Sequence, residues 1–280
     1  LPRMSKYPAS IAQFTRKGTP LEPGDVLRQP DLAETLTRIA AEGPAGFYTG
    51  RTADLMVAEM KAHQGIITHA DLSAYAAKVR TPLRGTYRGL NIITMPPPSS
   101  GGVALIAMLN VLEGYPLNEL GFGTTATLHR MAESMRRAFA DRARYLGDPD
   151  FNPDMPVGEL TSKPYATQQR ASIDLARASV SDPATFTWPK ESKETTHLSV
   201  VDKERNAVAL TYTLEYGYGS GIVVPGAGFL LNNEMGDFNA SPGLTSSEGL
   251  IGTDPNLTAP GKRMLSSMTP TILERDGQLF

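Results

Sequence analysis

The sequence predicts an α+β fold, because its hydrophobic pattern changes along the chain from a helical period to a strand period. Between residue 31 and about residue 145, apolar residues recur mostly at the three- and four-residue spacing of a helical face. From about residue 198 onward, apolar residues alternate with more polar neighbours, as they do on a half-buried strand. Antiparallel strands that follow a helical region are typical of layered α+β domains.

Capping and breaking residues place the expected helices. Asp31–Glu34, directly after Pro30, resembles a capping box at a helix start, and Gly43 suits a helix end. A strand is expected over residues 85–95, and the rigid loop Met95–Gly102, MPPPSSGG, leads from it into an apolar helix. The expected helices cover residues 31–42, 51–62, 71–76, 103–112 and 125–145. One face of the last helix is expected to hold Leu128, Met131, Met135, Ala138, Phe139 and Arg142.

The strand region consists of short runs separated by turn residues. The runs cover residues 198–200, 208–212, 222–224, 228–231 and 271–273. Lys203–Asn206 forms the turn of the first expected hairpin, and the Asp276-Gly277 pair predicts another hairpin turn near the end. Because the chain begins at Leu1 and stops inside this last hairpin, we expect it to be a segment of a longer protein.

The composition excludes several classes of function. The 280 residues are 40% hydrophobic and 20% charged, as in globular proteins, and the net charge is −2 with acids and bases interspersed. That balance predicts no nucleic-acid-binding surface. The lack of cysteine excludes disulfides, thiolate zinc sites and a cysteine nucleophile. The longest strongly apolar stretch, Val103–Leu109, is too short to span a bilayer, and the first residues do not form a signal peptide.

Two further patterns carry little functional information. The glycine-rich stretches 217–221 and 226–228 lack the Lys-Ser/Thr pair and the following helix of a phosphate-binding loop, which favours turns and close backbone approach. The four histidines show no ligand spacing, so we expect no metal site. A Ser-His-Asp triad stays open, although no G-x-S-x-G motif supports one.

The stretch KETTHLSVVD, residues 193–202, places two threonines where a polar segment becomes a strand. β-Branched residues favour strands, so Thr195 and Thr196 suit an ordinary strand entry. If the Glu194–Thr195 bond is cut, however, Thr195 gains an α-amino group with a pKa of about 7.7–8.0. Such an amine is well matched to act as the general base for the hydroxyl of the same residue.

Several ordered blocks make the chain resemble the γ-glutamyltranspeptidase family. These blocks are QPDLAETL, FYTG, MPPPSSGG, YLGDPDF, TTHLSVVD, LLNNEMGDF and PGKRMLSSMTPTI, in that order over nearly the whole chain. The resemblance implies the four-layer αββα sandwich of the N-terminal nucleophile hydrolases, with antiparallel sheets between helical layers. It also implies no cofactor, and a large-subunit segment, residues 1–194, followed by a small-subunit segment, residues 195–280.

The same resemblance implies roles in self-processing. Thr195 would attack the carbonyl of Glu194, and the precursor would divide between these two residues. Thr195 would then be the mature nucleophile. Thr213, in TYTLE, matches a family threonine that hydrogen-bonds near the nucleophile, although an outward-facing strand threonine fits its sequence context equally well.

The resemblance also implies a substrate-binding set. Glu234 and Asp237 match family acids that bind the α-ammonium of a γ-glutamyl group, and Glu215 stands where relatives have Asn or Glu. Ser266 and Ser267 match the pair that holds the α-carboxylate. Acids around one ammonium would suit a charge-assisted clamp, which orients the scissile amide. The family's carboxylate-binding arginine and oxyanion-hole glycines fall outside this segment.

Three functions follow as hypotheses. The favoured one is a γ-glutamyl transferase or hydrolase that cleaves glutathione-like compounds through a γ-glutamyl-threonine ester and passes the acyl group to water or an amine. The second is an acylase for glutaryl or cephalosporin substrates, which lack the α-ammonium. The third is a non-catalytic homologue that serves as a binding scaffold. Residues 239–265 are long enough to form the family's lid loop but contain no aromatic residue. The resemblance implies a periplasmic or extracellular protein.

Overall fold

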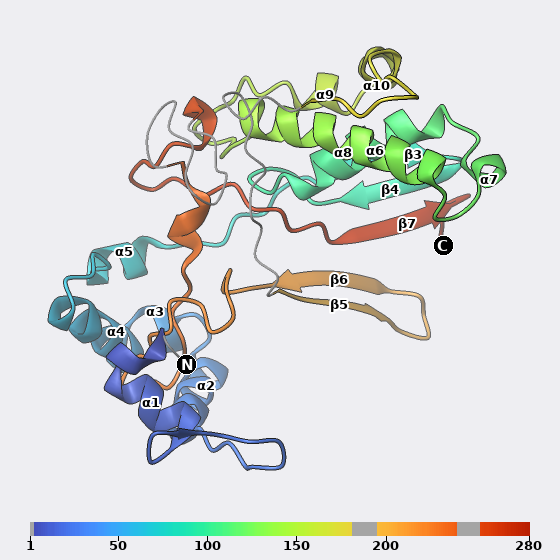
Figure 1. The fold of residues 1–280 in the computed structure, drawn as a ribbon. Helices are drawn as coiled ribbons and strands as arrows, with labels where there is room; N and C mark the ends of the chain where they lie inside the picture. Colours follow the sequence, from blue (N-terminus) through green and yellow to red (C-terminus); the bar gives the residue numbers. More distant parts are fainter. Residues whose placement is uncertain (1–2, 181–194, 240–252) are drawn as a thin grey trace. The chain divides into compact units, whose positions relative to one another are not determined.

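The computed structural model describes residues 3–180, 195–239 and 253–280, and these form two compact units (Figure 1). The described part of unit 1 comprises residues 3–79, Thr195 and Thr213–Asn233. The described part of unit 2 comprises residues 80–180, Thr196–Tyr212, 234–239 and 253–280. Each unit therefore contains residues that precede the Glu194–Thr195 bond and residues that follow it. The predicted division into a large and a small subunit concerns a peptide cleavage and stays a prediction.

Unit 1 is mainly helical. Its elements are the 3-10 turn η1 Met4–Lys6, the helices α1 Pro8–Phe14, α2 Pro30–Glu42, α3 Ala45–Tyr48, α4 Gly50–Ala62 and α5 His69–Ala74, and the short strands β1 Thr15–Arg16 and β2 Thr19–Pro20. The core joins α4 and α5 to the later segment: Ala53, Met56, Val57, Leu72, Val224 and Ala227. Thr68 and Asp71 form a capping box that starts α5, which the sequence pattern predicted as a short capped helix.

The glycine-rich segment of unit 1 is held by hydrogen bonds to its backbone. Thr35 Oγ1 on α2 donates to Ala227 O at 2.8 Å, and Ser10 Oγ donates to Gly221 O at 2.7 Å. A Cβ at Gly228 would stand 2.3 Å from Leu32 N, where no side chain fits. The predicted role of these glycines in close backbone approach is therefore confirmed.

Unit 2 contains an antiparallel sheet covered by helices. The sheet order is β3 Leu83–Tyr87, β4 Leu90–Thr94, β7 Thr271–Arg275 and β8 Gln278–Leu279, and a separate hairpin pairs β5 Thr196–Val201 with β6 Ala207–Tyr212. The helices are α6 Gly101–Glu113, α7 Leu117–Leu120, α8 Thr125–Tyr145, α9 Val157–Leu160 and α10 Lys163–Ala171. The predicted α+β class is confirmed.

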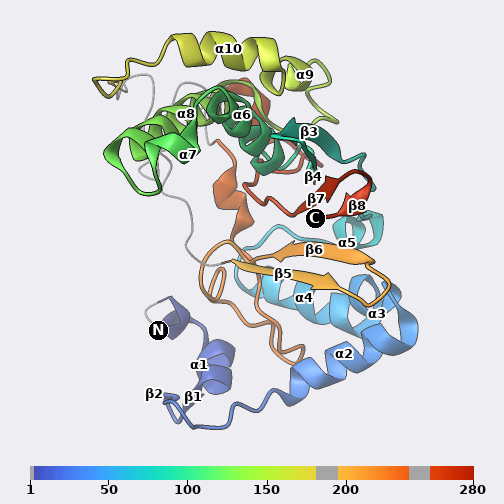
Figure 2. The same cartoon turned by 90° about the vertical axis from the view of Figure 1, so that its right-hand side faces the viewer.

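The elements of unit 2 lie in layers. In the two views of Figures 1 and 2, α6 and α8 cover one side of the four-stranded sheet, and the β5–β6 hairpin lies on the other side. One buried cluster, Val103, Leu146, Leu160 and Leu265, joins α6, α9 and the segment that leads to β7. Two 3-10 turns, η2 Glu234–Asp237 and η3 Asp254–Asn256, also belong to this unit.

Three local predictions were wrong. Residues 85–95 form no single strand, because the chain reverses at Arg88 and Gly89, whose φ angles are 48° and 80°. The runs 222–224 and 228–231 form only an isolated bridge between Val223 and Leu230, since the tight turn between them, where Ala227 N and Gly228 N donate to Val224 O, leaves too few residues for a longer ladder. No helix was predicted over residues 146–180, where the structure has α9 and α10.

The buried face of α8 also differs from the predicted apolar stripe. Leu128, Met131 and Met135 are 55%, 42% and 38% exposed, whereas Ala138 and Arg142 of the same stripe are buried. The other buried residues of the helix are polar: Thr127, Glu133 and Ser134. Hydrogen-bonding partners, rather than hydrophobicity, select the face of α8 that turns inward.

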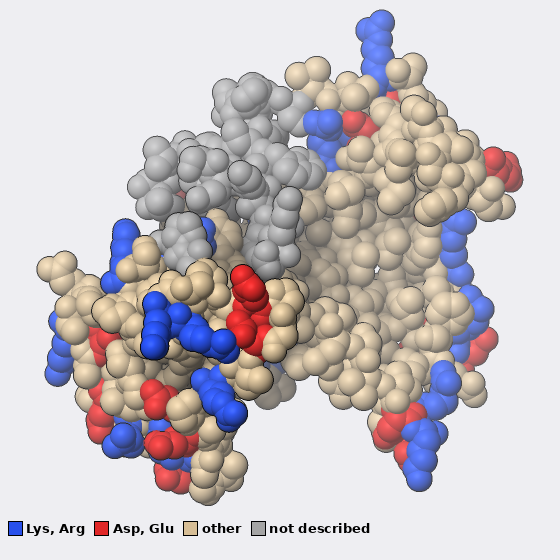
Figure 3. Space-filling model, turned by 60° about the horizontal axis from the view of Figure 1, so that its bottom comes forward, with Lys and Arg blue, Asp and Glu red and all other residues tan. Residues whose placement is uncertain are grey.

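The distribution of surface charge and the lengths of the helices test the expectations about nucleic-acid and membrane partners. On the face in Figure 3, basic and acidic side chains are interspersed and neither sign forms a continuous band. Within the described ranges, no helix is both long and apolar enough to cross a membrane.

Glu133 is the most strongly perturbed carboxylate of α8, and it yields a stability prediction. It is 1% exposed and accepts hydrogen bonds from Ser179 N at 2.9 Å, Ser179 Oγ at 2.5 Å and Arg137 Nη1 at 2.6 Å. Burial raises the pKa of Glu133, but the hydrogen bonds from Ser179 and Arg137 outweigh it and lower the pKa to about 2. We expect Glu133→Gln to lower the free energy of unfolding by about 2 kcal/mol at pH 7, because it removes the charge from these hydrogen bonds.

The pH dependence follows from the direction of that shift. A depressed carboxylate pKa contributes stability above its ordinary value of 4.5, and this contribution is lost as the pH falls toward about 2. Urea unfolding at pH 7 and pH 3 would show the difference between wild type and variant shrinking with acidity. Glu34→Gln, at an exposed acid of α2, is the control and should change the free energy by less than about 0.5 kcal/mol. An equal effect of both variants would contradict the prediction.

Candidate active site

Thr195 and Thr213, the two threonines that the family resemblance links to self-processing, are hydrogen-bonded to each other in unit 1. Thr195 directly precedes β5 and Thr213 directly follows β6, and the register pairs the intervening neighbours Thr196 and Tyr212. Thr195 Oγ1 donates to Thr213 Oγ1 at 3.3 Å, and Thr213 Oγ1 also accepts from Glu215 N at 2.9 Å. Thr195 is exposed, so its hydroxyl is open to a reacting group.

Glu215 occupies an unusual backbone conformation next to this pair. Its φ is 74°, in the left-handed region that costs a non-glycine residue on the order of 1 kcal/mol or more. Asn233 holds the strained turn: its Nδ2 donates to Glu215 Oε2, and its Oδ1 accepts from Tyr216 N at 3.1 Å. The sequence reasoning missed Asn233, although the Asn232-Asn233 pair before Glu234 was a visible signal.

Glu234 and Asp237 lie together on the turn η2 of unit 2. Glu234 is buried, at 9% exposed, and Asp237 is half-buried. Burial first, and then the charge and hydrogen bond of Asp237, raise the pKa of Glu234 to about 7. Near neutral pH this pair therefore carries a proton in a substantial fraction of the molecules.

Ser266 and Ser267 lie on a segment whose backbone is fixed by the MPPPSSGG loop. Ser100 N and Ser100 Oγ donate to Ser266 O at 2.8 and 2.7 Å, and Ser266 N donates to Pro98 O at 3.1 Å. Ser99 Oγ donates to Met268 O at 2.6 Å. The buried serines of the loop thus hold the backbone of the two serines expected to contact substrate.

Two further residues make this loop fit. Arg142 Nε on α8 donates to Ser100 Oγ at 2.8 Å, which orients that hydroxyl toward Ser266. A Cβ at Gly101 would stand 2.0 Å from Thr269 Oγ1 and 2.7 Å from Ser267 O, so only glycine allows this contact. The expectation that MPPPSSGG is a structural loop between a strand and a helix is confirmed.

The predicted site residues divide between the two units. Thr195, Thr213 and Glu215 are brought together in unit 1. Glu234, Asp237, Ser266 and Ser267 belong to unit 2. Glu194, the other side of the expected cleavage, lies outside the described residues, as do residues 240–252 of the expected lid loop. Among the residues that the structure describes, no cluster of three His, Asp or Glu could hold a metal ion.

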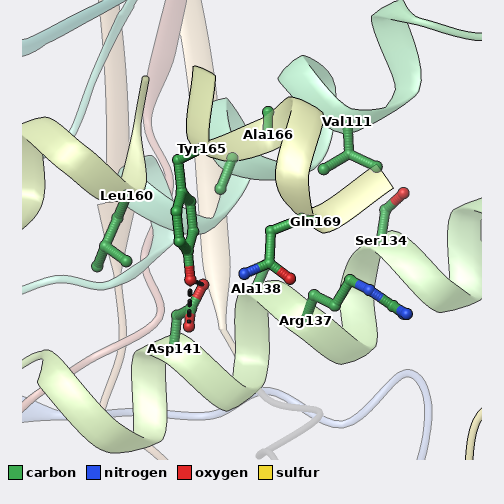
Figure 4. A pocket seen from close by; sticks show the side chains of 10 residues that line it. Val111, Ser134, Arg137, Ala138, Asp141, Leu160, Tyr165, Ala166 and Gln169 are labelled. Atoms are coloured by element: carbon green, nitrogen blue, oxygen red, sulfur yellow. Dashed lines mark hydrogen bonds between the residues drawn. The ribbon is translucent and has the colours of Figure 1, made fainter. Parts of the chain in front are cut away.

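A small pocket in unit 2 contains none of the predicted residues. It lies between α6, α8 and α10, and Figure 4 shows the Tyr165 hydroxyl pointing at the Asp141 carboxylate, 3.0 Å from each oxygen. Burial raises the pKa of Asp141, and burial together with Asp141 raises that of Tyr165 to about 12. The contact joins α10 to α8.

Comparison with known sequences gives one consistent family. The Gamma-glutamyltranspeptidase family model matches residues 1–280. The chain is 47% identical over 274 residues to the glutathione hydrolase proenzyme of Escherichia coli (strain K12), covering 97% of this chain and 47% of that protein. It is 39% identical over 281 residues to the Acylase ACY 1 proenzyme of Pseudomonas sp. (strain SE83), covering 99% of this chain and 47% of that protein. The chain thus spans about half the length of the curated relatives it matches.

Solved structures agree with the sequence comparison. Cephalosporin acylase from Bacillus halodurans matches with a TM-score of 0.79 and 28% identity, covering 96% of this chain and 46% of that one. Helicobacter pylori gamma-glutamyltranspeptidase matches with a TM-score of 0.62 and 44% identity, covering 64% of this chain and 51% of that one. These likenesses confirm the predicted fold class, the α+β sandwich of the N-terminal nucleophile hydrolases.

The Glu234–Asp237 pair yields a prediction about proton affinity. Asp237→Asn removes a neighbouring negative charge, so the pKa of Glu234 should fall from about 7 toward, but not to, its ordinary value of 4.5, because burial remains. Carbon-detected NMR titration of labelled glutamate side chains would measure the shift. Asp276→Asn, in the turn between β7 and β8, should leave this pKa unchanged. An unchanged Glu234 pKa in Asp237→Asn would mean that the two carboxyl groups are not coupled.

Proposed function

The chain belongs to the gamma-glutamyltranspeptidase family, and from this premise we infer that it is part of a self-processing γ-glutamyl hydrolase or transferase whose nucleophile is Thr195. The observation that supports this most directly is the hydrogen bond from Thr195 Oγ1 to Thr213 Oγ1 at the open end of the β5–β6 hairpin. A threonine hydroxyl held by a second hydroxyl, exposed and at a strand start, is placed to react. An ordinary strand entry needs no such partner.

Processing would begin with the Thr195 hydroxyl. Its oxygen attacks the carbonyl carbon of Glu194, the Glu194–Thr195 peptide bond breaks, and the hydroxyl proton ends on the nitrogen of Thr195. Water then hydrolyses the resulting ester, which returns the hydroxyl and leaves Thr195 with a free α-amino group. Thr213 would hold the hydroxyl during the attack. The precursor would divide into a large subunit ending at Glu194 and a small subunit beginning at Thr195.

The mature reaction would use the new amine as general base. With an ordinary pKa of about 7.7–8.0, this amine accepts the hydroxyl proton as Thr195 Oγ1 attacks the γ-carbonyl of the donor. The amide C–N bond breaks, the proton passes to the leaving amine, and a γ-glutamyl ester forms. Water or an acceptor amine then releases the γ-glutamyl group and restores the hydroxyl. Glutathione and related γ-glutamyl compounds are the proposed donors.

The proposed headgroup contacts follow from charge. Glu215, Glu234 and Asp237 would bind the α-ammonium, and Ser266 and Ser267 would hold the α-carboxylate. The raised pKa of Glu234 means that an arriving ammonium replaces a proton rather than entering a fully ionised, mutually repelling pair. We also propose a periplasmic or extracellular location, as the family resemblance implies.

An acylase function is the second candidate. The 39% identity to the Acylase ACY 1 proenzyme and the likeness to a cephalosporin acylase support it. A glutaryl donor lacks the α-ammonium that the proposed contacts with Glu215, Glu234 and Asp237 would bind, so these contacts would not contribute to its recognition. We therefore favour the γ-glutamyl donor.

The processing proposal predicts the behaviour of two neighbouring variants. In the full-length precursor, Thr195→Ala should abolish cleavage and leave one band on denaturing electrophoresis, because the attacking hydroxyl is gone. Thr196→Ala, one residue further along β5, should still yield two fragments, with Thr195 as the first residue of the smaller one by N-terminal sequencing. Cleavage of the Thr195→Ala precursor before residue 195 would overturn the assignment.

The substrate proposal predicts a donor preference. A charge-assisted contact contributes about 1.5–3 kcal/mol, so the mature wild-type enzyme should turn over γ-glutamyl anilide with a kcat/KM at least about tenfold above that of glutaryl anilide. Asp237→Asn should reduce this ratio, since it weakens only the donor that carries an ammonium. A wild-type preference for the glutaryl compound would favour the acylase function instead.

A further inference from the structure

One buried side chain joins the two segments of unit 2 that carry the proposed headgroup contacts. Asn256, on the turn η3, is 4% exposed. Its Nδ2 donates to Asp237 O at 2.7 Å, and its Oδ1 accepts from Leu265 N at 3.0 Å. Asp237 is one of the proposed ammonium-binding acids, and Leu265 directly precedes Ser266. The amide of Asn256 therefore bridges the acidic segment and the serine segment.

The two ends of this bridge are anchored differently. Leu265 is 2% exposed and packs in the core cluster with Val103, Leu146 and Leu160, and Ser266 is held by the MPPPSSGG loop. The acidic residues lie on a single 3-10 turn. Asn256 O also accepts from Asn239 N at 3.0 Å, just beyond that turn. Asn256 thus transfers the fixed position of the serine segment to the acidic turn.

The chemistry of the bridge requires an amide. It must donate to one backbone carbonyl and accept from one backbone N–H, and the side-chain amide offers both groups on one short, planar unit. An ionised aspartate has the same shape but no donor, so it would place a carboxylate oxygen against the carbonyl of Asp237. The distance between Asp237 O and Leu265 N would then no longer be fixed by the side chain of residue 256.

We propose that Asn256 is a positioning residue that sets the spacing between the ammonium-binding and the carboxylate-binding groups, and thereby selects donors that carry both charges. This inference rests on the proposed function, because it assigns both groups to one γ-glutamyl headgroup. A donor with both charges must satisfy both groups at one separation. A donor with only the carboxylate needs one group, so loosening the bridge penalises the doubly charged donor more.

The chain offers a matched control for this test. Asn110, on α6, is 3% exposed, and its Nδ2 donates to the backbone carbonyl of Thr161 at 2.8 Å. It joins α6 to the end of α9 and touches neither the acidic segment nor the serine segment. Asn110→Asp and Asn256→Asp therefore make the same chemical change at equally buried positions of the same unit.

The experiment uses the mature full-length enzyme with γ-glutamyl anilide and glutaryl anilide as probes. Asn256→Asp should raise the KM for the γ-glutamyl compound about tenfold and lower the ratio of the two kcat/KM values by a similar factor, with kcat changed less than about threefold. Asn110→Asp should lower the Tm but leave the ratio within about twofold of wild type. Asn256→Ser, which reaches at most one of the two partners, should lie between wild type and Asn256→Asp and serves if the latter fails to mature.

A pH series adds a readout that instability alone does not move. A protonated aspartic acid regains a donor and keeps an acceptor, so the KM defect of Asn256→Asp should shrink at acidic pH when compared with wild type at the same pH. If both Asn256 variants lower the Tm but leave the donor ratio at the wild-type value, the inference is overturned while the proposed function stands. If wild type itself prefers the glutaryl anilide, the proposed function fails, and the inference fails with it.

Discussion

The close packing of the loop Pro98–Gly102 against residues 266–268 is the constraint on which the candidate site in unit 2 depends. The two backbones exchange hydrogen bonds between Ser266 and the residues Pro98 and Ser100, and the hydroxyls of Ser99 and Ser100 donate to backbone carbonyls of the facing segment. They also approach so closely at Gly101 that a single methyl group would overlap Thr269. Because protein interiors are closely packed, this contact fixes the position of Ser266 and Ser267 relative to the start of α6. Arg142 Nε donates to the hydroxyl of Ser100, and this hydroxyl in turn donates to Ser266 O.

A similar use of backbone contacts shapes unit 1. The glycine-rich segment runs against α1 and α2 through hydrogen bonds from Ser10 and Thr35, which fix the chain that follows the turn bearing Glu215. Asn233 supports that turn, in which Glu215 has a φ of 74°, by donating to the Glu215 carboxylate and accepting from Tyr216 N. Strained backbone conformations of this kind are concentrated at functional sites, where the orientation of a side chain is needed for function. It is consistent with a carboxylate aimed at a ligand.

The sequence predicted the regular parts of the fold well and the connections poorly. Residues 125–145 form one helix over the predicted span, and the strands around 198–200 and 208–212 pair as expected, because strong periodicity is local information. The reversal at Arg88-Gly89 was missed because Arg is not a typical turn residue, so the flanking apolar residues read as one run. The face of α8 was misjudged because buried Glu133 and Arg142 find polar partners far along the chain.

The candidate site shows the same division between local and distant information. Thr195, Glu234, Asp237 and Ser266 were named from the family resemblance, since each motif is short and contiguous. The residues that hold them, such as Ser100, Asn233 and Asn256, were not, because most of their partners are backbone groups of distant segments.

A backbone partner leaves no trace in sequence pattern, since any residue type supplies the same N–H and C=O. What such a position does restrict is the other partner, which must be a side chain of fixed length with the right donors and acceptors. Asn256 illustrates this: its two partners could carry many side chains, but the bridge itself needs an amide. Buried Asn, Ser and Arg residues with backbone partners in functional segments are therefore where the structure adds most to the family resemblance.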